Sequence, residues 1–259
     1  MSFFTGKALP PLLMMAVISL PAMADEQPYT LSGMVGGGIG VKPAYLGARD
    51  DKTDFIPAVK LNYGPYFIGG VDTLTAVGWN FIDGEQWKFA LGVGSDLSPR
   101  QASDDEHLKG LGDIDVTPRA FLSGIYENTL FKGGVIATQD VGGNHQGLRV
   151  ITFAQLKWEP TETLSLFAGP TLSWGNSQYL QTQFGVTSEQ SARSGLPRYR
   201  AGSGLEDVGI NTGLDYQFAP SWVAGVRASA LYLTSDAADS PITEQSSQIR
   251  YGLFVAWRF

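Results

Sequence analysis

The chain has no cysteine and only two histidines in a length of 259 residues. The missing cysteines exclude both a disulfide framework and a thiolate metal site. Acidic residues outnumber basic ones by 25 to 18, and this balance argues against a nucleic-acid partner. Long apolar runs are missing too. Beyond residue 24, no segment has the roughly 20 consecutive apolar residues that a transmembrane helix needs.

The first 24 residues have the features of a secretory signal peptide. Lys7 precedes the mainly apolar segment 8–20, and Ala22-Met23-Ala24 supplies the small-residue pattern of a cleavage site. The apolar segment is too short to span a bilayer. We therefore expect residues 1–24 to be removed, which leaves residues 25–259 as a periplasmic, secreted or outer-membrane protein.

The C-terminal segment, from Ser247 to Phe259, alternates strictly between two kinds of residue. One face consists of Ile249, Tyr251, Leu253, Val255, Trp257 and Phe259. The other face is polar or small, with Phe254 as the exception. This pattern is typical of a transmembrane β-strand with lipid on one side. It also resembles the signal that delivers outer-membrane proteins to the barrel assembly machinery, and we assign Tyr251, Trp257 and Phe259 to that signal.

The same period of two residues recurs along the mature chain and predicts twelve strands. Their expected ranges are 29–42, 53–63, 65–71, 74–82, 86–97, 113–126, 129–139, 147–158, 163–175, 204–218, 221–233 and 247–259. Short connections alternate with long ones, as outer-membrane barrels alternate short periplasmic turns with long external loops. We predict an all-β protein, a transmembrane antiparallel barrel with periplasmic chain ends. Ten strands is the alternative if residues 67–81 form one bulged strand.

Four tryptophans help to distinguish this barrel from a soluble periplasmic one, whose exterior would be polar. Trp87, Trp158, Trp222 and Trp257 lie near short turns, on the apolar faces of their strands. There they would form one belt at the periplasmic interface, where amphipathic rings prefer to lie. The prediction is a protein of the Gram-negative outer membrane, surrounded by lipid and lipopolysaccharide.

The long loop 176–203 contains a helix candidate at residues 187–193. Thr187 or Ser188 can serve as N-cap, Gln190 follows at capping-box distance, and Gly195 can end the helix. Long loops without structure of their own are uncommon unless they are functional. We expect an ordered element that plugs the lumen or merely covers the mouth of the barrel.

This loop also carries the most specific motif of the chain, which includes Phe184, Gly185, Ser194, Gly195, Leu196 and Pro197. Together with segments 43–47, 110–113, 204–209 and 236–242, it resembles the MipA/OmpV family, the MltA-interacting protein and its relatives. The resemblance covers the whole mature chain. It implies a non-catalytic outer-membrane scaffold that brings a lytic transglycosylase to a peptidoglycan synthase in cell-wall assembly. Because relatives are described as porin-like or adhesive, a small-solute channel or surface adhesin is the alternative.

Catalytic chemistry has little support in the sequence. His107 and His145 both lie in expected external loops, and we interpret them as solvated residues, not as members of a catalytic constellation. The acidic segments 50–51 and 104–106 match no cation-binding loop. We therefore predict no enzyme activity, no cofactor and no metal site.

Charged residues on the inward faces of the strands are more informative. Arg227 and Arg250 lie on strands expected near Asp207 and Asp215, and Arg119 lies near Asp113, Asp115 and Lys132. Interior charge is costly unless it is paired or hydrated. These groups could therefore line a narrow polar pore, or pair across strands into a plug, and the sequence leaves both open.

Overall fold

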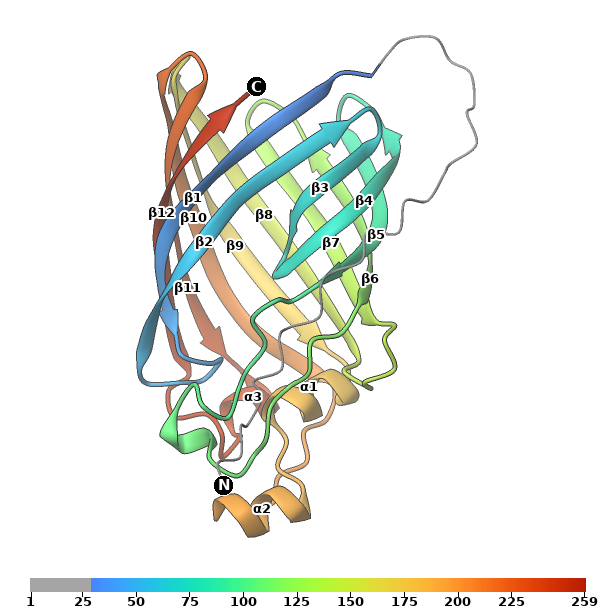
Figure 1. The fold of residues 1–259 in the computed structure, drawn as a ribbon, viewed down its shortest axis with the longest axis vertical. Coiled ribbons are helices and arrows are strands. Elements are labelled where there is room, and N and C mark those ends of the chain that lie inside the picture. Colours follow the sequence, from blue (N-terminus) through green and yellow to red (C-terminus); the bar gives the residue numbers. More distant parts are fainter. Residues whose placement is uncertain (1–28) are drawn as a thin grey trace, which may run out of the picture.

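The computed structural model describes residues 29–259, which form one closed antiparallel barrel of twelve strands (Figure 1). The strands are β1 (Leu31–Pro43), β2 (Asp51–Tyr63), β3 (Tyr66–Val71), β4 (Leu74–Asp83), β5 (Trp87–Ser95), β6 (Arg119–Glu127), β7 (Phe131–Asp140), β8 (Leu148–Thr161), β9 (Leu164–Gly175), β10 (Gly204–Ala219), β11 (Trp222–Leu233) and β12 (Ser247–Arg258). Consecutive strands are neighbours, and β1 pairs with β12 to close the barrel. The predicted fold class is confirmed, while the predicted signal peptide lies outside the described residues.

Helices occur only in the loops of the part of the chain that the structure describes. They are α1 (Ser177–Phe184), α2 (Ser188–Ser194), α3 (Ser235–Ala238) and a single 3-10 turn at Glu106–Leu108. Within residues 29–259, none of these helices is long and apolar enough to cross a membrane. Both α1 and α3 are absent from the sequence-based prediction.

Most predicted strand limits agree with the structure to within a few residues, but the start of β6 was wrong. A strand was expected from residue 113, whereas β6 begins at Arg119, directly after Pro118. Pro118 has no N–H to donate to a strand ladder. Ile114 instead donates its backbone N–H to the carbonyl of Arg100, 2.9 Å away, within the loop that connects β5 and β6.

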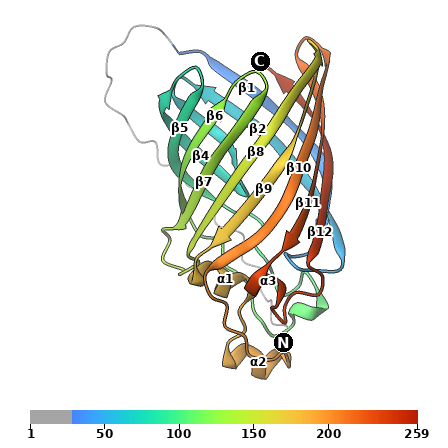
Figure 2. The same cartoon turned by 180° about the vertical axis from the view of Figure 1, so that it is seen from behind.

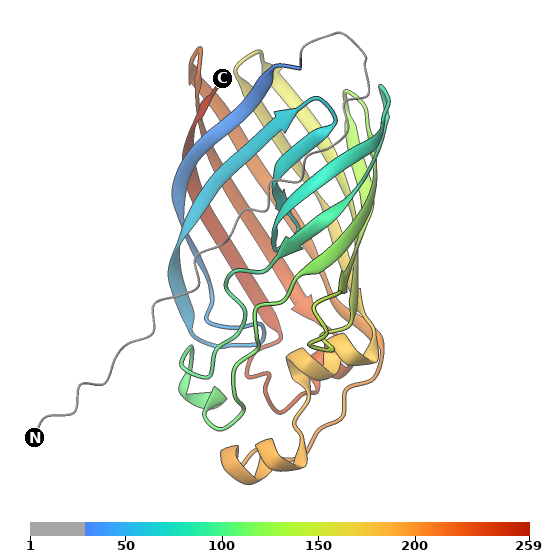
Figure 3. The ribbon, with the colours of Figure 1, turned by 45° about the vertical axis from the view of Figure 1, so that its right-hand side comes forward.

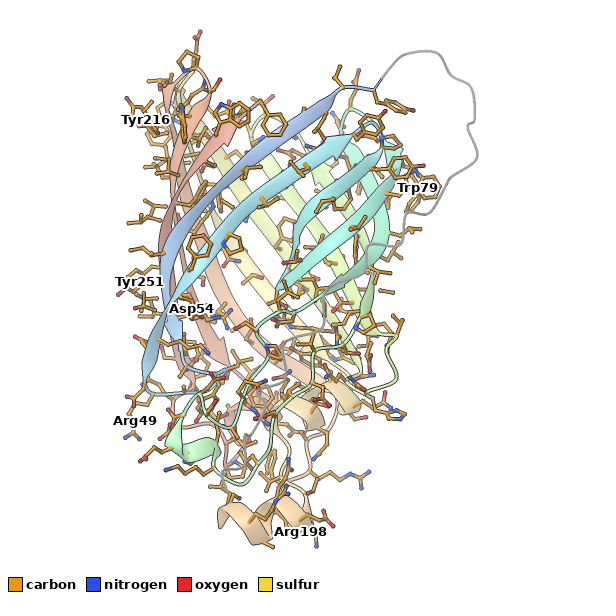
Figure 4. All side chains as sticks on the ribbon, viewed as in Figure 1. Arg49, Asp54, Trp79, Arg198, Tyr216 and Tyr251 are labelled. Atoms are coloured by element: carbon orange, nitrogen blue, oxygen red, sulfur yellow. The ribbon has the colours of Figure 1, made fainter. Side chains whose placement is uncertain are left out.

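The outer surface of the barrel is apolar, and the short turns all lie at one end, except for the Asp72–Thr73 corner between β3 and β4. On β12 the side chains of Tyr251 and Leu253 are more than half exposed on this surface. Trp79 and Tyr216 lie at the end with the short turns, whereas Arg198 lies among the helices at the other end (Figure 4). Outer-membrane barrels keep their short turns in the periplasm. The helical end is therefore the external one.

Glycines in β1 allow the first and last strands to meet. A Cβ atom on Gly36 would lie 2.0 Å from the carbonyl oxygen of Val255, and one on Gly38 would lie 2.0 Å from that of Leu253. Beyond the end of β12, Phe259 exchanges two backbone hydrogen bonds with Gly33, of 3.0 and 3.1 Å. The seam between β1 and β12 therefore depends on positions without side chains.

The external loops pack together into a cap over the barrel mouth (Figure 2). One hydrophobic cluster consists of Ala44, Tyr45, Ala48, Leu108, Leu111, Val186 and Ile242, and a second of Leu180, Phe184, Ala201, Leu233 and Ala237. The predicted helix is present as α2, with a capping box between Thr187 and Gln190 and a left-handed Gly195 at its end. Segments from four different loops thus share buried apolar surface.

The barrel wall is interrupted on one side. Strand β2 pairs with β1 at thirteen positions, from Tyr63 to Asp51, but with β3 at only four, from Tyr63 to Lys60. The hairpin of β3 and β4 turns back at Asp72, so the stretch Asp51–Val59 of β2 has no strand partner on this side. Figure 3 shows the short hairpin ending well before β2 does. We call this interruption the lateral gap.

The glycine seam can be tested with two matched alanine variants. Gly38→Ala places a methyl group against the Leu253 carbonyl, and we expect a destabilisation of about 1–3 kcal/mol, seen as a smaller heat-modifiable folded fraction on gels. Gly70→Ala is the control, because nothing lies within 4 Å of a Cβ atom there. Equal folded fractions for the two variants would contradict a tight seam.

Candidate functional site in the barrel lumen

Arg149 of β8 is the centre of a buried ion network at the external end of the lumen. Its Nε donates to Glu206 Oε2 at 2.7 Å, and its Nη2 donates to Ser173 Oγ at 3.1 Å. Nη2 also lies 3.6 Å from Asp207 Oδ2. The third partner is Asp72 at the tip of the β3–β4 hairpin, which pairs with Nη1. One guanidinium therefore connects β8, β10 and the end of the short hairpin.

The cap joins this network through Tyr179 of α1. The phenol donates to Glu206 Oε1 at 3.2 Å, and the ring lies 6.0 Å from the Arg149 guanidinium and 5.7 Å from that of Arg119. Burial and the nearby Glu206 carboxylate raise the pKa of Tyr179 well above its ordinary value. The phenol consequently stays protonated at neutral pH and remains a donor. Glu206 itself is fully buried.

A second ion pair lies deeper in the lumen, toward the periplasmic end. Arg227 of β11 makes a bidentate pair with Asp215 of β10, with Nη2 at 2.8 and 2.9 Å from the two carboxylate oxygens. The guanidinium also lies between the rings of Phe167 and Phe254, 5.2 and 5.1 Å from their centroids. Both charged side chains remain about one third exposed or more, so water reaches this pair.

Three lumen arginines form no ion pair among residues 29–259. Arg119 donates to the carbonyls of Thr138 and Gly147, each at 3.0 Å, and Arg100 donates to the carbonyl of Gln183 at 2.7 Å. Arg250 of β12 is the third, and its buried Nε has no hydrogen-bond partner in this part of the chain. Burial lowers the pKa of Arg100 to about 10, so this group is still cationic at neutral pH.

These groups surround one cavity of about 870 Å³ in the lumen. Its charged lining residues are Lys42, Lys52, Arg100, Arg119, Arg149, Arg227 and Arg250 against Asp54, Asp72, Asp96, Asp104 and Asp115. Glu206, Asp207 and Asp215 pair with Arg149 and Arg227 from behind this lining, so the charges around the cavity nearly balance. Arg100, Arg119 and Arg250 are the lining cations that form no ion pair among residues 29–259.

The structure brings together only some of the charges expected to pair. Asp215 meets Arg227, but Asp207 meets neither Arg227 nor Arg250. Residue Gly213 is the partner of Arg227 in the β10–β11 register, and Asp207 lies six positions further along β10, roughly 20 Å away. Asp207 pairs with Arg149 instead. Arg119 likewise does not meet Asp113, Asp115 or Lys132, because its guanidinium donates to backbone carbonyls.

The family motif of the long loop holds the cap in shape. Phe184 is fully buried in the second hydrophobic cluster, and Gly185 follows α1 as its C-cap. Ser194 Oγ donates to the Gln190 carbonyl at 2.7 Å and accepts from the Leu196 N–H at 3.2 Å. Leu196 packs on the first cluster, and Pro197 follows it in the segment that leads toward β10. These residues therefore stabilise the loop and do not line the lumen cavity.

Residues that could hold a metal ion do not gather within the described part of the chain. No group of three or more His, Asp or Glu side chains is placed to bind one there. Asp104 is engaged by Lys52 at 3.0 Å, and Glu106 by Lys109 at 2.9 Å. His107 Nε2 lies 2.9 Å from the Pro241 carbonyl, within the cap.

Sequence reasoning missed Arg149 as the central residue, together with its partners Asp72 and Tyr179. Arg149 is visible on the polar face of its strand, and Asp72 in a tight corner. Both are polar residues near the external ends of their strands, where the cap covers the lumen. The sequence gives no other signal that they meet. Their meeting depends on the hairpin being short and its tip reaching β8.

An antiparallel barrel with an apolar exterior, an aromatic belt and a charged lumen is the architecture of a bacterial outer-membrane protein. Residues 35–259 match the model of the family described as MltA-interacting protein MipA. The chain therefore belongs to the MipA family, and it is an outer-membrane protein.

Further comparisons found similar solved barrels but no matching curated sequence. The NanC porin is 10% identical with a TM-score of 0.43, covering 89% of this chain and 100% of its own. OmpT, an outer membrane protein of Vibrio cholerae, is 8% identical with a TM-score of 0.39, covering 89% of this chain and 97% of its own. A bacterial polysaccharide outer membrane secretin is 8% identical with a TM-score of 0.43, covering 88% and 98%.

Replacing Arg149 and Arg227 one at a time shows how much each ion pair contributes to the stability of the barrel. Arg149→Gln leaves Asp72, Glu206 and Asp207 without their cation, and we expect a loss of about 3–5 kcal/mol in stability. Arg227→Gln removes a more exposed pair, and we expect a loss below about 1 kcal/mol. Unfolding in detergent, followed by circular dichroism, measures both. A larger effect for Arg227→Gln would show that the lumen is ordered around the deeper pair.

Proposed function

We propose that this protein is a non-catalytic adaptor that holds a murein hydrolase, a lytic transglycosylase, at the periplasmic face of the outer membrane and links it to a peptidoglycan synthase. Membership of the MipA family over residues 35–259 is the observation that carries the proposal, because the family is described by its interaction with MltA. The shape of the barrel supports it. The external mouth is covered by the cap, which disfavours an open pore.

The periplasmic rim offers the contact surface for such a partner. The sequence predicts its short turns at Gly64–Pro65, Glu127–Asn128, Glu159–Pro160 and Ala219–Pro220. The third position is wrong, because Glu159 and Pro160 belong to β8 and the turn lies at residues 162–163. Segment 25–28, which is expected to take part, lies outside the described residues. The turn between β6 and β7 is held by its own side chain, because Asn128 Oδ1 accepts the N–H groups of Leu130 and Phe131 at 2.9 and 2.8 Å. Glu127 in turn accepts from Lys157 at 2.8 Å.

This turn presents an apolar anchor to the periplasm. Leu130 is 69% exposed, although the backbone around it is fixed by Asn128. A rigid turn loses little conformational entropy on binding, and exposed apolar anchors with such support are favoured at interfaces. Leu130 is therefore the residue on this rim whose change should affect partner binding most.

The test is retention of a purified lytic transglycosylase on the immobilised barrel. We expect the wild-type protein to retain it, and Leu130→Glu to reduce retention about tenfold or more, in line with the loss of one interface anchor. Val141→Glu is the matched control, since Val141 is similarly exposed but lies on the external side. If the wild type retains no hydrolase, the adaptor proposal is wrong.

A small-solute channel is the second candidate, favoured by the cavity of about 870 Å³ inside the lumen. A channel predicts stable conductance steps in planar bilayers, which the capped barrel should not show. Conductance without hydrolase retention would replace the adaptor with the channel. Retention without conductance supports the adaptor alone.

A further inference from the structure

The lateral gap lies at the depth of the membrane, not above it. Tyr63 belongs to the periplasmic end of β2, and Phe55 lies eight residues away along the strand. At about 3.3 Å per residue and a tilt near 40°, this distance is roughly 20 Å along the membrane normal. Because the apolar band of such barrels is about 25 Å tall, Phe55 lies within the outer leaflet. Its side chain is 70% exposed.

An open strand edge cannot face hydrocarbon, because each unsatisfied backbone group there costs several kcal/mol. Irregular backbone at this depth is tolerated where it lines a water-filled cavity. The unpaired part of β2 meets this condition, since segment 54–57 lines the lumen cavity. Pro57 within it has no N–H to leave unsatisfied. Water in the lumen therefore reaches the strand edge at the height of the outer leaflet.

The cavity reaches the unpaired edge of β2 at this point. Asp54 and Ile56 point inward, and consecutive residues of segment 54–57 line the cavity along this edge. The same cavity is also lined by Asp72, Thr73, Thr75 and segment 96–100. Figure 4 shows Asp54 on β2, in the half of the barrel nearer the external loops. The lateral gap is therefore the part of the wall where no strand ladder separates this cavity from the outer leaflet.

The rim of the gap is apolar, and the wall beside it is cationic. Ile56 covers Gly40 and Gly252, where its Cδ1 leaves no room for a Cβ atom, and Leu97 across the opening is 69% exposed. Near the external end of the gap, Lys42 and Lys52 are neutralised by Asp54 and Asp104, at 2.9 and 3.0 Å.

Arg250 is the neighbour of Lys42 in the register across the seam, where Tyr251 faces Val41. Unlike Lys42, Arg250 has no carboxylate partner among residues 29–259, and neither has Arg100. The Nε atoms of both arginines are buried without a hydrogen bond from this part of the chain. The apolar rim thus borders the same cavity that both guanidinium groups line.

We infer that the lateral gap is a portal through which a single-chain anionic amphiphile enters the lumen from the outer leaflet, with its acidic head at Arg250 and Arg100 and its chain along Ile56 and Phe55. Neither guanidinium group has a carboxylate at ion-pair distance among residues 29–259, so each can accept an anion, and the open strand edge that lines the same cavity admits an apolar chain. A fully water-soluble anion would not enter through an opening at the depth of the membrane, because it does not dissolve in the lipid. This inference concerns the external half of the barrel and does not depend on the adaptor function at the periplasmic rim.

Cysteine protection tests the portal directly, because the natural chain has no cysteine. Ile56→Cys is refolded into nanodiscs of zwitterionic lipid, and its rate of labelling by a maleimide is measured with and without dodecanoate. We expect dodecanoate to slow labelling at least tenfold. Ile39→Cys is the control: it lies on the lipid-facing side of β1, which is paired on both edges, and its labelling should not change.

Three further probe molecules and two arginine variants distinguish how much the acidic head group and the apolar chain each contribute to protection. Dodecanol, hexanoate and inorganic phosphate at the same concentration should protect little. Arg250→Gln should raise the half-protecting dodecanoate concentration about tenfold, as expected for a lost charge-assisted hydrogen bond. Arg258→Gln, on the same strand at the periplasmic end, should not.

The remaining outcomes overturn the portal. Equal protection by dodecanol would exclude recognition of an anionic head, and equal protection by hexanoate or phosphate would assign the site to soluble anions. No protection by any probe would show that the opening is not a route. Should Ile56→Cys fail to fold, Thr75→Cys on the opposite side of the same cavity is the reporter, and lack of protection there counts equally against the portal.

Discussion

The guanidinium of Arg149 is the interaction on which the external half of the barrel depends. It holds three carboxylates from two parts of the chain, Asp72 at the hairpin tip and the adjacent Glu206 and Asp207 of β10, in a largely buried region. A buried charge cluster of this kind adds little net stability compared with an apolar core, but it is expensive to break. Its effect is to fix the relative positions of three elements. The hairpin tip, the external end of β10 and helix α1 must all lie where their side chains reach the Arg149 network.

The cap and the lateral gap follow from that geometry. With the tip of the β3–β4 hairpin held at Arg149, the hairpin ends inside the outline of the barrel, and β2 continues alone toward the external side. Above the same network, Tyr179 anchors α1 over the lumen. The barrel is therefore covered at its external mouth and interrupted in its wall beside β2.

The strands could be predicted because lipid and lumen impose a period of two on every strand, and the belt of Trp87, Trp158, Trp222 and Trp257 marks one membrane surface. Helix α2 could be predicted too, since Thr187, Gln190 and Gly195 are local signals. The lumen pairs could be predicted only where the two strands are neighbours. Arg227 and Asp215 are diagonal neighbours on β11 and β10, whereas Arg149 meets Asp72 from 77 residues away. That contact depends on strand stagger and hairpin length, which no local pattern encodes.

The shared packing of the external loops has a consequence for how the surface of this protein can vary in evolution. External loops of outer-membrane proteins are usually independent, and each can change under pressure from phages or antibodies without affecting its neighbours. Here Tyr45, Leu108, Val186 and Ile242 from four loops share one cluster, so a change in one loop must be matched in the others. The loop between β7 and β8 contributes to neither cluster, and a side chain on Gly143 would meet nothing within 4 Å. Sequence diversity among close relatives, and tolerance of inserted epitopes, should concentrate in that loop.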